Sequence, residues 1–93
     1  MSIEDTLKER GATYGSYAKN VEARANIMSI LDAHKQSCKG KPLSPFERIF
    51  LHDVVMKLVR LAGEPHHEDS AHDLAGYGLL IETLIKEHKD ASK

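Results

Sequence analysis

Five charged side chains in the second half of the sequence have the types and spacing of a polar ligand site. Asp53, Lys57 and Arg60 follow one another at intervals of four and three residues, and Asp69 and Asp73 follow at an interval of four. On a helix with about 3.6 residues per turn, such intervals place side chains on one face. Arginine and lysine bind phosphate, and carboxylates bind Mg²⁺. The cluster therefore predicts a site for a phosphate group or a hard cation.

Two helices joined by a short turn must carry these residues. Ser44, Pro45 and Glu47 predict a strong start for the first helix. Serine caps a helix, proline fits its first position, and a glutamate three residues after the serine completes a capping box. We expect this helix to run to about Ala62, with Gly63 as its C-terminal cap.

The second helix of this hairpin is expected from about Asp69 to His88. Acidic residues begin it and basic residues end it, which suits the helix dipole. Gly76 and Gly78 lie in its interior, where each costs roughly 1 kcal/mol relative to alanine. We therefore expect another backbone to approach closely there. The hairpin turns the charged faces of its two helices towards each other.

Two further helices are expected before the hairpin. A short helix over about residues 3–9 begins with a capping box and is ended by Gly11, and a long helix begins after Ser16 and reaches about Gln36. No stretch shows the alternation typical of a strand. The sequence predicts a single all-α domain over residues 1–93, a helical bundle of three to four helices with a central helical hairpin.

The helix from Pro45 to Ala62 is apolar on more than one side. Arg48 and His52 are expected on a narrow side that faces solvent. A helix this apolar is expected to be buried from two directions, which favours a homodimer or a higher homo-oligomer. The apolar residues on the face of Lys57 are Phe46, Ile49 and Phe50, and those on the second face are Leu51, Val55, Leu58 and Ala62.

Composition excludes several classes of protein. The chain has 13 basic and 14 acidic residues, so no excess of positive charge favours a nucleic-acid partner. Its one cysteine, Cys38, cannot form an internal disulfide, which favours a reducing cytoplasm. No apolar run reaches the roughly 18 residues of a membrane span, so no membrane association is expected. The N-terminus lacks the basic start and apolar centre of a signal peptide.

Two interpretations of the charged cluster stay open. In the first, the charges form an ion-pair network that joins two helices, because charges beside apolar side chains are costly unless they are paired. In the second, the cluster is a pocket beside the glycine-containing loop near Tyr14, where the cations bind phosphate or the carboxylates hold Mg²⁺. The ligand-binding candidates are Lys57, Arg60, Asp69, Asp73, Tyr14 and Tyr77, and the metal-binding candidates are Asp53, Asp69 and Asp73.

The histidines allow a different metal hypothesis. His66, His67 and His72, with the acids between them, are residue types that bind Zn²⁺. His66 and His67 follow a proline in the expected turn, so a role in hydrogen bonding or helix entry is the favoured interpretation.

The stretch from Lys57 to Tyr77 resembles a family of small phage and prophage proteins. The shared pattern is K-x-x-R, then G-x-P-x-H-x-D, then D-x-A-G-Y, and residues 10–17 match an R-x-x-x-Y-G element near the N-terminus of that family. This resemblance implies a phage protein that acts in the cytoplasm of a host bacterium, with a host protein as one candidate partner.

More distantly, the hairpin is similar to the MazG-like all-α nucleotide pyrophosphohydrolases. Those enzymes bind Mg²⁺ with E-x-x-E on one helix and E-x-x-D on the next, and they form dimers or tetramers. Asp69 and Asp73 fall at the second acidic pair, although they are four residues apart. Lys57 and Arg60 have the spacing of the first pair but carry the opposite charge. The resemblance thus implies nucleotide binding, with Mg²⁺ as a possible cofactor and no catalytic residue assigned.

Two other functions stay open. One is a phage-encoded interaction or regulatory module that uses the helical fold without small-molecule chemistry. The other is a metal phosphohydrolase of HD type, because the adjacent pair His52 and Asp53 resembles the motif of that family. Such a site needs a further histidine and aspartate, for which the candidates are His34 and either Asp69 or Asp73.

Overall fold

The described residues form four helices. The structure, a computed structural model, describes residues 2–14 and 16–91, and it describes the side chains of these residues except 7, 10–14, 90 and 91. The helices are α1 (Ile3–Tyr14), α2 (Tyr17–Lys39), α3 (Pro45–Gly63) and α4 (Glu68–Ala91). No strand occurs in this part of the chain. The predicted all-α class is confirmed.

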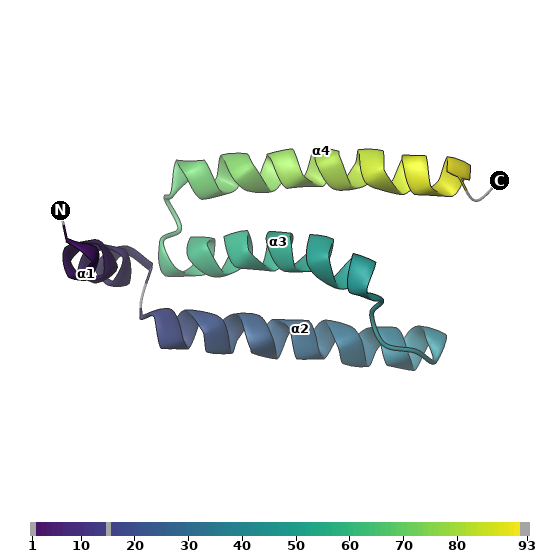
Figure 1. Cartoon of the computed structure of the whole chain (residues 1–93), viewed down its shortest axis with the longest axis horizontal. Helices are drawn as coiled ribbons and strands as arrows, with labels where there is room; N and C mark the ends of the chain where they lie inside the picture. Colours follow the sequence, from purple (N-terminus) through teal and green to yellow (C-terminus); the bar gives the residue numbers. More distant parts are fainter. Residues whose placement is uncertain (1, 15, 92–93) are drawn as a thin grey trace.

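Three of the helices lie side by side in one layer. Figure 1 shows α3 between α2 and α4, with each neighbour running antiparallel to it and with α1 at one end of the layer. Helix α3 contacts all three other helices. The chain is elongated, with extents of 51 × 25 × 23 Å. The central position predicted for the helix that begins at Pro45 is confirmed.

The starts of α2 and α3 follow local capping chemistry. The hydroxyl of Ser16 accepts a hydrogen bond from the backbone N–H of Lys19 at 3.2 Å. The capping box of α3 is complete, because Ser44 Oγ accepts from the Glu47 N–H at 3.1 Å and Glu47 Oε1 accepts from the Ser44 N–H at 2.9 Å. Such caps satisfy backbone donors that have no partner inside the helix. Gly40 ends α2 with φ +71°, the left-handed conformation that favours glycine.

Two predicted helix ends are wrong. Helix α1 does not end at residue 9 but continues through Gly11 to Tyr14. Gly63 is the last residue of α3 instead of its cap, and the N–H of Glu64 still bonds to the carbonyl of Arg60. A Cβ added at Gly76 or Gly78 would meet nothing within 4 Å, so no backbone of the same chain approaches there.

The buried core of the described residues is small. Its apolar members are Met28, Leu43 and Val55, which come from α2, the loop after it and α3. Large apolar side chains remain exposed on every helix: Ile3, Tyr17, Val21, Ile30, Phe46, Ile49, Leu58, Leu79, Leu80 and Ile85. None of the helices in the described residues is both long and apolar enough to cross a membrane.

Polar contacts surround this core at the junction of α2 and α3. The guanidinium of Arg48 binds the carboxylate of Asp32 through two N···O distances of 2.8 Å. His52 Nε2 lies 3.5 Å from Nη1 of Arg24. Arg48 is exposed to solvent, as expected, although its guanidinium also reaches Asp32 of α2, whereas His52 is only partly exposed beside Arg24. Helix α3 contacts α2 on this side, yet Phe46, Ile49 and Leu58 stay exposed, so α3 is less buried within one chain than its sequence pattern predicts.

Candidate functional site

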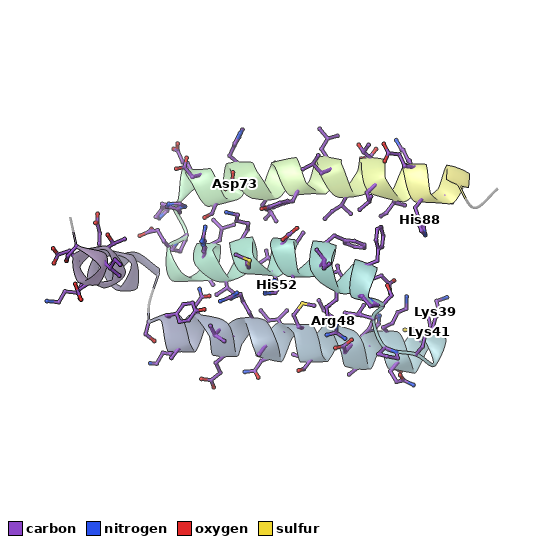
Figure 2. The ribbon with its side chains drawn as sticks, viewed as in Figure 1. Lys39, Lys41, Arg48, His52, Asp73 and His88 are labelled. Atoms are coloured by element: carbon purple, nitrogen blue, oxygen red, sulfur yellow. The ribbon has the colours of Figure 1, made fainter. Side chains whose placement is uncertain are left out.

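The charged residues of the hairpin meet between α3 and α4. Lys57 Nζ lies 2.9 Å from Asp73 Oδ2. The lysine side chain is only 10% exposed, whereas that of Asp73 is 48% exposed. The prediction that the charged faces of the two helices point towards each other is confirmed for this pair. Figure 2 shows Asp73 near the start of α4, on the same level as the second half of α3.

Arg60 also acts on Asp73. The hydrogen bond from Lys57 has the largest effect and lowers the pKa of the Asp73 carboxyl below its usual value of 3.8. Burial opposes this lowering, and the charges of Lys57, His72 and Arg60 each add a smaller lowering effect. Arg60 is partly buried and close enough to stabilise the ionised carboxylate. Asp73 is therefore an anion at neutral pH, stabilised by Lys57 and Arg60 of α3.

The other predicted ligand residues do not take part in the ion pair between Lys57 and Asp73. Tyr77 is partly buried and lines a cavity of about 320 Å³ together with Asp73, and the remaining lining residues are His72, Gly76 and Leu80. Asp69 is exposed in the first turn of α4, and no hydrogen bond or ion pair of its side chain occurs among the described residues. Tyr14 belongs to α1, but its side chain lies outside the described residues.

The predicted metal ligands do not form a cluster. Asp53 lines a different cavity of about 330 Å³ between α2 and α3, together with Met28, Arg48, Ile49 and His52. Among the described side chains, no group of three or more histidine, cysteine, aspartate or glutamate residues could hold a metal ion. The structure thus does not bring Asp53, Asp69 and Asp73 together as a cation site.

The histidines have local partners. His67 Nδ1 accepts a hydrogen bond from the backbone N–H of Ser70 at 3.2 Å and lies 2.8 Å from its hydroxyl. His67 therefore caps the start of α4, which confirms the interpretation of the turn histidine as a helix-entry residue. His34 lies beside Cys38, with 3.5 Å between Nε2 and Sγ. No metal site of HD type joins His34 to His52 in the described part of the chain.

Sequence reasoning missed a third cavity, at the end of the layer opposite Asp73. It has a volume of about 620 Å³ and opens between the α2–α3 loop and the last turns of α4. Phe46 packs edge-on against Phe50 and stacks on His88, with ring centroids 5.6 and 5.2 Å apart. Lysines on its rim are Lys35, Lys41 and Lys89. The residues of this cavity come from α2, the loop after it, α3 and α4, so no local sequence pattern joins them.

The chain matches a protein-family model over most of its length. Residues 3–85 match the model described as domain of unknown function DUF6378. The chain belongs to the DUF6378 family. The match covers α1, α2, α3 and most of α4, including the whole polar hairpin. No curated protein and no solved structure matches this DUF6378 chain.

Proposed function

We propose that this DUF6378 protein is a phage-type, MazG-like protein that binds a nucleotide or another phosphate-bearing small molecule at the α3–α4 hairpin. We further propose that it works as a homo-oligomer in the cytoplasm of the bacterial host, with no metal-dependent hydrolysis of MazG type. One observation carries the proposal: a nearly buried lysine, Lys57, held by a single half-exposed carboxylate beside a cavity.

The position of Lys57 favours a ligand. Burying an ammonium is costly unless it is paired, and a buried ion pair often adds no stability relative to apolar residues of similar volume. Few residues of this chain are buried, and an ion pair in the middle of its central helix does not add to that small apolar core. Because Asp73 is half exposed, its carboxylate has room to turn away when a phosphate takes its place. Arg60 would then grip the same phosphate through two parallel hydrogen bonds.

Hydrolysis through a metal cage is not supported by the residues present. The MazG-like mechanism uses two acidic pairs, and this hairpin carries Lys57 and Arg60 at the spacing of the first pair. Positive charge at this point repels Mg²⁺. The described side chains also supply no cluster of three acidic or histidine ligands.

Calorimetry with a panel of nucleoside mono-, di- and triphosphates tests the binding. Arg60→Gln should weaken binding by about tenfold or more, since a hydrogen bond to a charged group contributes roughly 1.5–3 kcal/mol. Lys41→Gln is the matched control, because it removes a cation at the other end of the layer. Equal losses in both variants, or no binding of any nucleotide by the unmodified protein, would contradict the proposal.

The absence of hydrolysis needs a separate assay. We expect no pyrophosphate release from nucleoside triphosphates with Mg²⁺ or Mn²⁺. Release that disappears in Asp69→Asn and Asp73→Asn would show that the acidic pair of α4 holds a catalytic metal, and it would overturn this half of the proposal.

A second candidate function is a protein-interaction or regulatory module. The exposed apolar side chains on every helix favour it, because contiguous apolar surface marks interaction sites. A host protein whose binding is unchanged by Arg60→Gln and by Lys57→Gln would favour this function over nucleotide binding.

A further inference from the structure

The cavity between the α2–α3 loop and the end of α4 takes no part in the proposed phosphate site. Its volume of about 620 Å³ lies in the range of small-molecule pockets. Figure 2 shows Lys41 and His88, two of its lining residues, at the end of the layer opposite Asp73. A ligand in this cavity would not touch the ion pair between Lys57 and Asp73.

The wall of this cavity is apolar and largely aromatic. Phe46 lies edge-on to Phe50, with ring planes at 81°, and it stacks on the ring of His88 at 25°. Pro42 and Ile85 extend the apolar lining. Despite these neighbours Phe46 is still 43% exposed, so part of its ring is open to another ring. Because aromatic pairs are stabilised beyond the area that they bury, this wall favours a flat aromatic group.

The remaining lining of the cavity is positively charged. Three lysines and one glutamate line it, which leaves a net charge of +2 with His88 neutral. Lys35 is already compensated, because its Nζ lies 2.7 Å from Glu47 Oε2. Lys41 and Lys89 are exposed, and neither forms an ion pair within the described part of the chain. These two lysines therefore supply positive charge for an anionic group.

The same lining limits the charge that a ligand can carry. Glu47 is an anion at neutral pH, because the hydrogen bonds from Lys35 and Ser44 lower its pKa to about 2. A fixed carboxylate in the wall repels a group with several negative charges, such as a triphosphate. Among the described residues no arginine lines the cavity, so it lacks the planar fork that holds phosphate through two parallel hydrogen bonds. A singly charged carboxylate suits this lining better.

We infer that this cavity is a binding site for a flat aromatic carboxylate. The ring system of the ligand packs on Phe46 and Phe50, and its carboxylate faces Lys41 and Lys89. The two parts of such a ligand match the two parts of the lining. The site is separate from the nucleotide site proposed at the α3–α4 hairpin, and either can fail without the other.

Titration with naphthoate and two analogues tests the chemistry of the ligand. We expect naphthoate to bind saturably and to shift the amide NMR signals of the residues around the cavity. Neutral naphthalenemethanol should bind about fivefold more weakly, because it lacks the charge that the lysines attract. Decahydronaphthoate keeps the charge but has no aromatic ring, so it should bind about threefold more weakly. No saturable binding of naphthoate, or equal binding of either analogue, would overturn the inference.

Matched variants locate the site. Lys41→Gln combined with Lys89→Gln should weaken naphthoate binding by about fivefold, and Phe46→Leu should weaken it by about threefold through the loss of the aromatic ring. Lys19→Gln, at the start of α2, is the control and should stay within about twofold of the unmodified protein. All four side chains are exposed, so we expect the variants to fold, which circular dichroism checks. Equal losses in the double variant and the control would overturn the site.

A cross-test separates this cavity from the proposed nucleotide site. Arg60→Gln should leave naphthoate binding within about twofold, because Arg60 lies in the last turn of α3 and the cavity lies at the first turns. Adenosine triphosphate should not displace naphthoate. Displacement by the triphosphate, with its binding lost in the double variant of Lys41 and Lys89, would overturn the inference, because the cavity would then hold the nucleotide. A protein that binds naphthoate but no nucleotide would contradict the hairpin site alone.

Discussion

The two junctions of α3 are built in opposite ways. Where α3 meets α2, apolar residues form the centre, and the ion pairs Lys35–Glu47 and Arg48–Asp32 lie at the partly exposed edge, at 2.7 and 2.8 Å. Where α3 meets α4, the buried residues are polar: Lys57 within α3 and Ser70 within α4. The charge lies at the rim of one junction and near the centre of the other.

This difference separates stability from function. Apolar burial is the main source of folding free energy, and exposed ion pairs at its edge contribute little. A buried lysine adds no comparable gain. We interpret the α2–α3 junction as the part that stabilises the chain, and the α3–α4 junction as the part that retains polar groups for a ligand. Three predictions test this comparison, from the largest expected effect to the smallest.

Substitution of the central residues should separate the two junctions most clearly. Val55→Ala should lower the free energy of unfolding by about 2 kcal/mol, because it leaves a cavity in the core. Lys57→Met, in the same helix, should leave stability unchanged or raise it, since an apolar side chain of similar length replaces a buried charge and the remaining Asp73 carboxylate is half exposed to water. Urea denaturation measures both variants. A greater loss in Lys57→Met than in Val55→Ala would reverse our interpretation of the junctions.

The buried serine of the hairpin should have a smaller effect. Ser70 is fully buried and its hydroxyl lies 2.8 Å from His67 Nδ1, so Ser70→Ala should cost about 1 kcal/mol through the lost hydrogen bond. Ser29→Ala, at an exposed position of α2, is the control and should stay within about 0.5 kcal/mol of the unmodified protein. Thermal melts compare the two, and equal stability would mean that the contact with His67 is not needed to begin α4.

The ion pair between Lys35 and Glu47, at the edge of the α2–α3 junction, should make stability depend on pH. The hydrogen bond from Lys35, aided by those from Ser44, lowers the pKa of Glu47 from 4.5 to about 2. A lowered folded-state pKa gives stability that is present above the unfolded value and is lost as the pH falls towards the folded value. We therefore expect stability to fall between about pH 4.5 and pH 2, and Glu47→Gln to flatten the curve in that window.

Urea midpoints measured from pH 6 to pH 2 provide the test. Lys35→Met should flatten the same window, because it removes the donor with the largest effect on Glu47. An unchanged slope in both variants would show that this pair does not couple to folding.

The local features of the sequence predicted the fold well where the chemistry is local. Ser44, Pro45 and Glu47 predicted the start of α3 to the residue, because a cap and its backbone partners lie within one turn. Local glycines were less informative: Gly11 lies inside α1 and not at its end. A glycine weakens a helix by about 1 kcal/mol, which neighbouring residues and contacts readily outweigh.

The charged cluster shows the limit of helical periodicity. Asp53, Lys57 and Arg60 share a broad face in sequence, yet Asp53 lines the cavity towards α2 whereas Lys57 pairs with α4. Periodicity gives the angle of a side chain around its own helix, but it does not give the position of the neighbouring helices. A spread of a few tens of degrees is enough to send two residues of one face to different partners.

The sequence by itself determined that the chain is helical, where α2 and α3 begin, and that α3 is central, because capping and apolar periodicity act within a few residues along the chain. Only the tertiary structure decided that Asp73, and not Asp69, pairs with Lys57, and that Asp53 stays apart from both. It also decided that three helices form one layer and leave large apolar side chains exposed on each of them. These outcomes depend on the rotation and spacing of packed helices, which residues distant in the sequence set together.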